Sequence, residues 1–509
     1  MNRTFTASPA QLAYFDFLRN GHGSAIVEAV AGAGKSTTLV KGMEHTQGTR
    51  TCLVFNNKMA KELREKAEGV MDPRDIKTFH AAGYAALRRA FPNAGFTKRD
   101  PDDKKVLRLV EARILQMDRR DLVGLEPVVA SVVSMAKQRG IGALSPINVD
   151  AHWHEMIDHF ALDTALPEGQ EHMLPQVVKL AQLALRDSNE SLEAIDYDDM
   201  VYLPLLRRVR FFRTDWVFID EAQDTNPTRR ALAGMMLRPG GRLVAVGDPH
   251  QAIYGFTGTD NDSLEQIARE YQAVRLPLTV TYRCPKSVVE IARQYVSHIT
   301  AHETAPEGEV VRYQYSELAD HIKLGDAVLC RYNKYLVSLC FRLIKNGIAA
   351  KIEGRSIGEG LVKLAGRWKS IKTLNALENK LVEYSERETE KAKAKGNDQR
   401  IEEIQDRQET MDVLIGRARE LGMDQVSQLQ EMIRGMFADD VSSRNIVTLC
   451  SEHRAKGLEW DRVHILGLDE IQPGRARHDW QMAQEYNLMY VAVTRAKRIL
   501  HIVSGLKDE

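Results

Sequence analysis

The stretch AIVEAVAGAGKSTTLV, residues 25–40, decides how the rest of the chain is interpreted. It begins as a short apolar run typical of a buried strand and continues with the spacing of a helix. Between the two, residues 29–36 match the phosphate-binding pattern G-x-x-x-x-G-K-[ST], with Ala29 in the first glycine position. Small residues there let backbone N–H groups close around phosphate oxygens at the start of a helix. The stretch therefore predicts a nucleotide-binding α/β fold.

The same pattern assigns roles to single residues. Lys35 is expected to reach the β- and γ-phosphates of ATP, and Ser36 to ligate Mg²⁺. The alternative is a glycine-rich turn with a solvated lysine, which would need neither a strand before it nor a helix after it. The residues expected to hold the nucleotide here are Ala31, Gly32, Ala33, Gly34, Lys35, Ser36 and Thr37.

A second apolar run ends in acidic residues, VFIDEAQD at 217–224. Asp220 is expected to hold Mg²⁺ through a water molecule, and Glu221 to activate the attacking water. The alternative is a solvated acidic loop. Ser36 and Asp220 are much farther apart in the chain than a minimal nucleotide-binding unit requires, which predicts a domain inserted between them.

Short β-branched runs predict two parallel sheets. The first sheet is expected to contain strands at 25–28, 51–55, 216–219 and 243–246. The second is expected to contain strands at 327–330, 446–450, 463–467 and 499–503. Strands that alternate with helices are typical of an α/β fold.

Two long stretches have helical patterns instead. Between 83 and 189, an apolar helix face is predicted from Val106, Leu109, Val110, Ile114 and Met117. Between 361 and 440, two apolar seams flank a charged segment and predict a helical hairpin that turns at Gly396-Asn397. The seam residues are Leu374, Leu377, Leu381 and Tyr384, then Ile401, Ile404, Met411, Ile415 and Ala418.

Composition excludes several classes of protein. The chain has 509 residues with 70 basic and 70 acidic side chains, so it is not a histone-like polycation, although a local basic groove remains compatible with this balance. Its five cysteines are scattered without a C-x-x-C pair, which argues against a disulfide framework and a zinc ribbon. No signal peptide and no apolar run of about 20 residues is visible, so we expect a cytoplasmic protein without membrane contact.

Further motifs accompany the phosphate-binding pattern, before and after it, in a characteristic order. Together with 29–36 and 217–224, they resemble the motif series of superfamily 1 helicases of the UvrD/Rep/PcrA group, from Gln11 to Lys497. The TFH motif and residues 247–254 are also similar to motifs of the F-box helicase branch. The additional motifs are residues 5–11, FNNKMA at 55–60, TFH at 78–80, VGDPHQAIYGF at 246–256, TYR at 281–283, HRAKGLE at 453–459 and YVAVTRAK at 490–497.

The resemblance implies two RecA-like P-loop domains with parallel sheets and a helical insertion in each. The implied ATP-binding domain comprises 1–82 and 190–276, with the helical insertion at 83–189. The implied second RecA-like domain comprises 277–360 and 441–509, with a small helical-hairpin insertion at 361–440.

The resemblance also implies further residues of the ATP site. Gln11 would recognise adenine, Tyr282 would stack on it, and Glu459 would contact the ribose. Arg283 and Arg495 would neutralise charge on the transferring phosphoryl group, and Gln251 would sense the γ-phosphate. The implied catalytic set is therefore Lys35, Glu221, Gln251, Arg283 and Arg495. For any single arginine or tyrosine, the alternative is a surface ion pair or core packing.

The implied DNA contacts are Phe55, Asn57, His80, Tyr254 and Phe256. Stacking of bases on aromatic rings tolerates any sequence, as a translocase requires. For Phe55 the alternative is core packing, and for His80 it is a capping or core role. Thr257 replaces the arginine usual in the family, which puts one polar link between the nucleotide and DNA sites in doubt.

Two other charged segments are interpreted as structural. The arginine-rich segment 207–213 is expected to be a solvated helix end rather than a nucleic-acid patch. The acidic residues of 196–199 are expected to cap a helix rather than to bind metal.

The implied function is an ATP- and Mg²⁺-dependent single-stranded DNA translocase and 3′→5′ DNA helicase. One alternative is a translocase that strips proteins from single strands with little unwinding. Another is a P-loop ATPase switch without motor activity. The expected partners are single-stranded and forked DNA and a replication or repair protein, and the expected state is a monomer of bacterial or phage origin.

Overall fold

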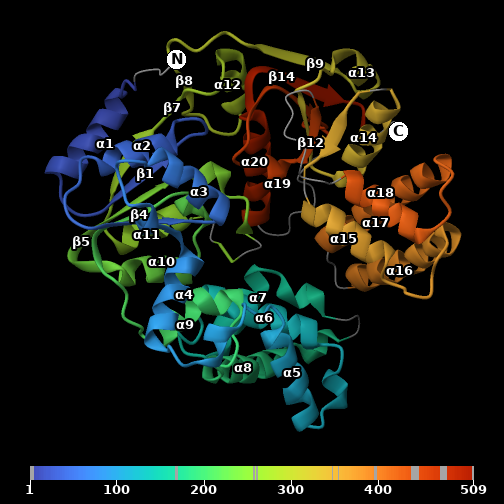
Figure 1. Cartoon of the computed structure of the whole chain (residues 1–509), viewed down its shortest axis with the longest axis horizontal. Coiled ribbons are helices and arrows are strands. Elements are labelled where there is room, and N and C mark those ends of the chain that lie inside the picture. Colours follow the sequence, from blue (N-terminus) through green and yellow to red (C-terminus); the bar gives the residue numbers. More distant parts are fainter. Residues whose placement is uncertain are drawn as a thin grey trace. The chain divides into compact units, whose positions relative to one another are not determined.

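A computed structural model gives the fold of the chain. It describes residues 5–166, 170–255, 258–259, 262–346, 348–353, 355–394, 398–436, 446–470 and 479–506. Phe256, Thr257 and the expected turn at Gly396-Asn397 lie outside the described residues. The chain divides into two compact units, Met1–Thr279 and Val280–Glu509, and each contains a sheet covered by helices (Figure 1). No helix in the described ranges is long and apolar enough to span a membrane.

The first unit is built on a sheet of six parallel strands in the order β3-β2-β4-β5-β1-β6. All four strands predicted for this sheet are present, while β3 and β6 were not predicted. The carboxyl ends of parallel strands meet at one edge of a sheet, and the phosphate-binding loop follows β1 at that edge. The strands are β1 (Ala25–Ala29), β2 (Arg50–Val54), β3 (Ile76–Thr78), β4 (Thr214–Ile219), β5 (Leu237–Gly247) and β6 (Val274–Leu278).

Helices accompany this sheet and also form a separate helical part. Those associated with the sheet are α1 (Pro9–Asn20), α2 (Lys35–Met43), α3 (Asn57–Lys66), α4 (Phe79–Ala90), α9 (Tyr197–Leu206), α10 (Pro227–Met235) and α11 (Ser263–Glu270). The helical part contains α5 (Lys105–Gln116), α6 (Glu126–Arg139), α7 (Asp150–His159) and α8 (Leu174–Glu190).

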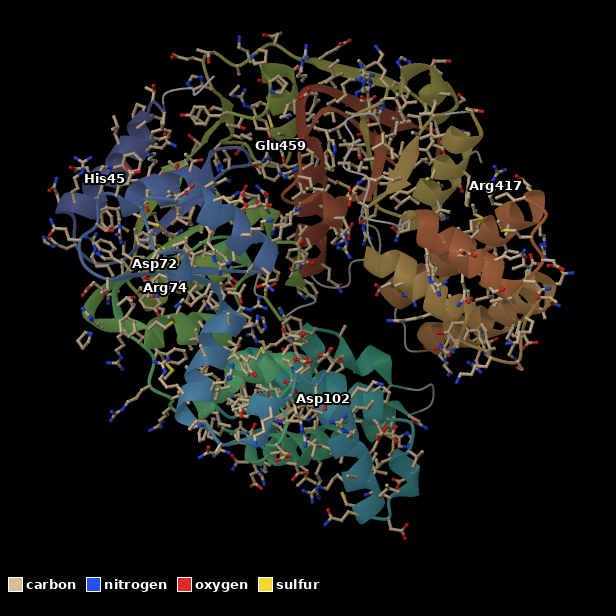
Figure 2. The ribbon with its side chains drawn as sticks, viewed as in Figure 1. His45, Asp72, Arg74, Asp102, Arg417 and Glu459 are labelled. Carbon is tan, nitrogen blue, oxygen red and sulfur yellow. The ribbon has the colours of Figure 1, made fainter. Side chains whose placement is uncertain are left out.

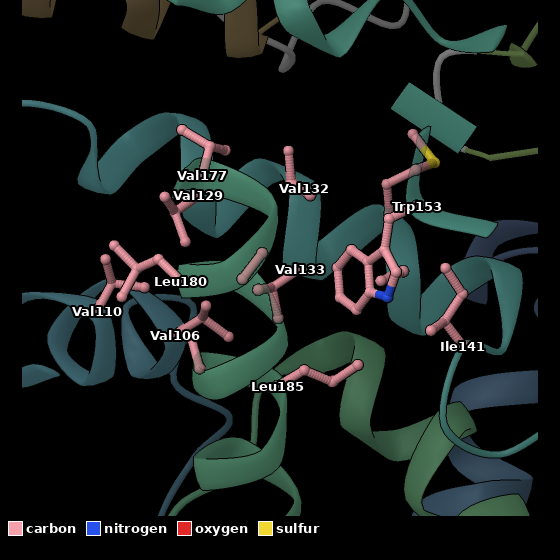
Figure 3. Packing of buried hydrophobic residues seen from close by; sticks show 14 of the residues in the cluster. Val106, Val110, Val129, Val132, Val133, Ile141, Trp153, Val177, Leu180 and Leu185 are labelled. Atoms are coloured by element: carbon pink, nitrogen blue, oxygen red, sulfur yellow. The ribbon is translucent and has the colours of Figure 1, made fainter. Parts of the chain in front are cut away.

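The helical part has its own hydrophobic core, in which valines and leucines of α5, α6 and α8 pack around Trp153 (Figure 3). Val106, Val110 and Ile114 are buried there, as their spacing predicts. The predicted face is wrong at Met117, whose side chain is 37% exposed. Helix α5 ends at Gln116, so the helical periodicity no longer directs the next side chain toward the core.

A buried cluster of four charged residues joins α5 and α6 to α9. Lys105 Nζ lies 2.6 Å from Asp199 Oδ2, and Lys137 Nζ lies 2.5 Å from Asp196 Oδ2 and 2.7 Å from Asp199 Oδ1. Asp196 is also the N-cap of α9 and forms a capping box with Asp199. The structure confirms the predicted capping role and adds an ionic one, because each carboxylate is paired with a buried lysine.

The second unit contains another parallel sheet of six strands, in the order β11-β12-β10-β13-β14-β9. The four strands predicted for this unit are present within a few residues of their predicted ends. The strands are β9 (Glu309–Gln314), β10 (Ala327–Cys330), β11 (Ala350–Ile352), β12 (Val447–Ser451), β13 (Trp460–Leu466) and β14 (Ala496–Ser504). A two-stranded sheet pairs β7 (Val280–Thr281) with β8 (Thr300–Ala301).

Helices of the second unit include the predicted hairpin. They are α12 (Lys286–Ala292), α13 (Leu318–His321), α14 (Asn333–Lys345), α15 (Arg355–Ala365), α16 (Leu374–Ala394), α17 (Asp398–Glu420), α18 (Val426–Met436), α19 (Glu452–Ala455) and α20 (Asp479–Val493). Arg419, near the end of α17, binds Asn375 and Glu378 near the start of α16, so the two helices are antiparallel.

The hairpin shares a hydrophobic core with the second sheet. Leu377 and Leu381 of α16 belong to the same buried cluster as Leu336 of α14 and Val328 of β10. By contrast, Ile401 and Ile404, at the start of α17, form a small cluster of their own. The base of the hairpin is therefore continuous with the sheet domain.

Candidate ATP and DNA sites

The phosphate-binding loop has the backbone that its small residues predict. Gly32 and Gly34 have φ angles of 73° and 79°, in the left-handed region where glycine is favoured. Gly34 is the N-cap of α2, so the helix begins at Lys35. The first N–H groups of α2 have no intrahelical acceptor, which makes this end of the helix suited to bind phosphate.

Ser36 and Asp220 are brought together from 184 positions apart. The Ser36 hydroxyl donates to Asp220 Oδ2 at 3.1 Å. Mg²⁺ takes an octahedral set of oxygens at about 2.1 Å, which places adjacent ligands about 3 Å apart. The two side chains therefore have the chemistry and the spacing that a magnesium site needs.

Electrostatics at this site favour a cation. Burial, together with the neighbouring charge of Glu221, raises the pKa of Asp220 to about 6 against the opposing positive charge of Lys35. Burial also raises the pKa of Asp248, again against the effect of Lys35. A divalent ion beside Asp220 would stabilise its ionised form.

Gln223 links the ends of β4 and β5, a role that the sequence analysis did not assign. Its Nε2 donates to Glu221 Oε2 at 2.5 Å, and its Oε1 accepts from the Asp248 backbone N–H at 3.0 Å. Gln251 Nε2 donates to Asp248 Oδ2 at 2.6 Å, which extends the network. A Cβ atom on Gly247 would lie 2.4 Å from Gln223 Oε1, so this bridge requires the glycine.

Gln11 lies beside the phosphate-binding loop, where its amide makes two contacts. Its Oε1 accepts from the Ser8 backbone N–H at 2.9 Å in a capping box at the start of α1. Its Nε2 donates to Thr38 Oγ1 in α2 at 2.7 Å. The same residue therefore orders the start of α1 and holds it against α2.

The second unit contains the other residues implied for the ATP site. Arg283 Nε donates to the carboxylate of Glu459, labelled in Figure 2, at 2.6 Å. Tyr282 beside them is 46% exposed. Arg495 is only 1% exposed, and its guanidinium donates to the carbonyls of Val491 and Leu458. In this structure Arg283 is thus paired with Glu459, and Arg495 is hydrogen-bonded to backbone of its own unit.

The aromatic residues implied for DNA binding meet at the carboxyl edge of the first sheet. Phe55 follows β2, and its ring is parallel to that of Tyr254, with centroids 5.7 Å apart and an interplanar angle of 4°. We call these two residues the aromatic pair. Burial and the nearby charge of Arg229 lower the pKa of His80 to about 4, so this imidazole is neutral at pH 7. Asn57 is exposed at the first position of α3.

The arginine-rich segment 207–213 does not join this edge. It precedes β4, whereas the aromatic pair and Asp220 lie at the carboxyl ends of strands. Arg207, Arg208, Arg210 and Arg213 are exposed, while Val209 is buried. The exposed arginines directly follow the end of α9, as predicted, and their interpretation as a solvated helix end rather than a nucleic-acid patch stays a prediction.

Three features together define a P-loop nucleotide hydrolase. They are the phosphate-binding loop, the Ser36–Asp220 pair suited to Mg²⁺, and the carboxylate of Asp248 at the end of the neighbouring strand β5. Comparison with known families makes the class specific: residues 13–272 match the UvrD/REP helicase N-terminal domain, and 256–506 match the UvrD-like helicase C-terminal domain. The chain belongs to the UvrD/Rep helicase family and is an ATP-dependent DNA helicase.

Two relatives show how far the similarity extends. The ATP-dependent DNA helicase PcrA of Staphylococcus epidermidis is 23% identical, over 96% of this chain and 82% of the relative. The protein of the same name from Staphylococcus aureus is 22% identical, over 95% of this chain and 82% of its own length. The similarity therefore covers both units.

Proposed function

We propose that the protein translocates along single-stranded DNA in the 3′→5′ direction and uses Mg²⁺-dependent ATP hydrolysis to separate strands. One observation supports the proposal: the short segment 248–254 runs from the polar network beside the phosphate-binding loop to the aromatic pair proposed to bind DNA. Asp248 and Gln251 belong to the polar network of Glu221, and Tyr254, three residues later, stacks on Phe55. A change at the γ-phosphate can thus reach the aromatic pair through six residues of backbone.

The proposed roles in ATP hydrolysis are assigned residue by residue within each unit. Lys35 neutralises the β- and γ-phosphates, Ser36 and Asp220 hold Mg²⁺, and Glu221 activates the attacking water. Gln11 and Tyr282 contact adenine, and Glu459 contacts the ribose. Gln251 senses the γ-phosphate, and Arg283 and Arg495 stabilise charge in the transition state. For Arg495, this role requires exchange of its hydrogen bonds to Val491 and Leu458 for phosphate oxygens.

The proposed DNA site consists of the aromatic pair with Asn57, His80 and Phe256. The rings offer stacking surfaces, which bind bases without sequence preference. Because His80 is neutral at pH 7, it would contact DNA through a hydrogen bond rather than through charge. Single-stranded and forked DNA are the proposed substrates of a cytoplasmic monomer, and a replication or repair protein is the proposed partner.

The decisive experiment measures ATP hydrolysis with and without single-stranded DNA, in the wild type and in two variants. Glu221→Gln should bind ATP but lose turnover by about 10²- to 10⁴-fold, the usual contribution of a general base. Lys35→Ala should abolish hydrolysis because the loop loses its cation at the phosphates. Wild-type hydrolysis by Glu221→Gln would disprove the assignment of the base.

The same preparations distinguish the alternatives for the motor. A wild-type enzyme that DNA does not stimulate would be a nucleotide switch. A stimulated enzyme that cannot open a forked duplex would be a translocase that strips proteins. Unwinding of a duplex with a 3′ overhang, but not of one with a 5′ overhang, would support the proposed polarity.

A further inference from the structure

We propose that Arg229 is a positioning residue that links the aromatic pair to the loop that carries Glu221, and so makes ATP hydrolysis respond to DNA. The proposal rests on the proposed function, because it assumes that bases stack on Phe55 or Tyr254. Arg229 belongs to α10 and has no role in the motifs quoted from the sequence. Its side chain is nevertheless buried, with 9% exposure, between the acidic loop and the aromatic pair.

Two contacts place the Arg229 guanidinium between these sites. Its Nη1 donates to the Asp224 carbonyl at 3.0 Å. Its Cζ lies 4.7 Å from the centroid of the Phe55 ring, within the range of a cation–π interaction. One planar group therefore touches both the DNA side and the nucleotide side of this sheet edge.

The Asp224 end of this link leads directly to Glu221. The backbone N–H of Asp224 donates to the Glu221 carbonyl at 3.0 Å, which closes a single turn. Glu221 itself has a φ of 51°, a left-handed backbone that a non-glycine residue adopts only when its surroundings hold it there. A shift of Arg229 would therefore pull on a turn whose geometry aims the Glu221 carboxylate.

At its other end, the link responds to whatever stacks on Phe55. Tyr254 and Arg229 both lie against the Phe55 ring, so a base that stacks on a face covered by either of them must displace it. Burial lowers the pKa of Arg229, and the charges of Asp224 and Asp198 offset this only in part, but a guanidinium remains charged at pH 7 in proteins. The cation is therefore retained where a base arrives.

The neighbouring Arg230 is a matched control on the same helix. It is also buried, and its guanidinium donates to the Thr225 carbonyl and to the side chain of Gln266. It thus holds the next carbonyl of the same segment through contacts with α11. If Arg229 merely fastens α10 to this loop, the two arginines should be equivalent in function.

The test compares Arg229→Gln, Arg229→Lys and Arg230→Gln with the wild type, using an oligothymidylate as the DNA. We expect Arg229→Gln to lower the ratio of DNA-stimulated to DNA-free kcat about tenfold, within the usual range for coupling between two sites, with little change in KM for ATP. Arg229→Lys keeps the charge but not the planar double contact, so its ratio should be intermediate. Arg230→Gln should keep the wild-type ratio.

A double variant tests the route through Phe55. If Arg229 acts through this ring, Phe55→Ala combined with Arg229→Gln should lower the ratio no further than the more severe single variant. Three results would overturn the inference: additive losses of the ratio in the double variant, a wild-type ratio in Arg229→Gln, or equal losses of the ratio in Arg229→Gln and Arg230→Gln. If Arg229→Gln does not fold, Arg229→Lys takes its place in the comparison. A wild-type ratio in Arg229→Lys would also overturn the inference. A wild-type enzyme that DNA does not stimulate would instead refute the proposed function.

Discussion

Glu452 shows how tertiary surroundings set the chemistry of a single residue. It is the first residue of α19 and is buried in the second unit. Burial raises its pKa to about 7, against the opposing charge of Arg331 and with a smaller contribution from the charge of Glu485. Arg331 is already paired with both oxygens of Glu485, at 3.0 and 2.9 Å, so it compensates Glu452 only in part.

Replacement of Glu452 by glutamine should therefore change the pH dependence of stability. Because the folded pKa lies above the ordinary value of 4.5, the folded state binds the proton more tightly than the unfolded state does. This stabilisation is fully present below pH 4.5 and is lost as pH rises through about 7. The free energy of unfolding of the wild type should fall by about 3 kcal/mol more than that of Glu452→Gln between pH 4.5 and 8.5.

Urea unfolding of both proteins at several pH values measures this difference. Groups that do not interact with Glu452 titrate alike in the two proteins, so the difference between the curves reports on Glu452 and the charges beside it, chiefly Arg331 and Glu485. Parallel curves would mean that Glu452 has an ordinary pKa in the folded protein.

At the scale of the elements, the buried charges hold α5 and α6 against α9. Lys137 contacts both Asp196 and Asp199, and Lys105 contacts Asp199 alone. Asp196 also caps α9, so the same carboxylate orders the helix end and binds a neighbouring helix. Helical periodicity alone would have placed apolar residues here, and the charges are tolerated because they are paired.

Lys137→Met should destabilise the protein by about 3–5 kcal/mol, because it leaves a buried carboxylate without its partner. The matched control is Arg108→Ala, which removes an exposed ion pair with Asp102, labelled in Figure 2, and should cost no more than about 1 kcal/mol. Chemical unfolding of both variants gives the two values. Equal losses would show that the buried cluster adds nothing beyond an ordinary surface pair.

At the scale of the whole molecule, the hairpin of α16 and α17 raises the question of what belongs to the motor. Its base shares a core with the second sheet, while the sequence predicts a solvated tip over 385–400. Ser385 is buried, so the described tip begins at least one residue later than predicted. The helicase motifs lie outside the hairpin.

Replacement of residues 386–400 by a short glycine-containing turn should preserve DNA-stimulated ATP hydrolysis, though unwinding or partner binding can change. As a contrast, Leu377→Ala in the shared core should cost about 2–5 kcal/mol in stability. Steady-state ATPase with oligothymidylate and thermal unfolding provide the two readouts. A shortened protein that folds but is not stimulated by DNA would place the tip within the motor.

The sequence predicted most of the elements and the nucleotide site, for a local reason. A strand followed by AVAGAGKS and a helix encodes the loop in consecutive residues, and all eight predicted strands are found. The helical face of α5 was predicted at Val106, Val110 and Ile114, whereas Leu109 is only half-buried and Met117 lies where the helix had already ended. Strands β3 and β6 of the first sheet, β9 and β11 of the second, and the short pair β7 and β8 were missed, because their short runs acquire strand structure only by pairing with neighbouring strands.

By itself, the sequence determined what depends on neighbours along the chain: the strand and helix periods, the glycines of the phosphate-binding loop and the order of the motifs. Only the tertiary structure decided which distant side chains meet. Lys105 pairs with Asp199 across 94 positions, and Ser36 meets Asp220 across 184. Gln223, Asp198 and Arg229 have no periodicity that marks them. Their protonation, burial and contacts arise when separate strand ends and helices come to one edge, where each side chain loses water and must find a partner among residues far away in the chain.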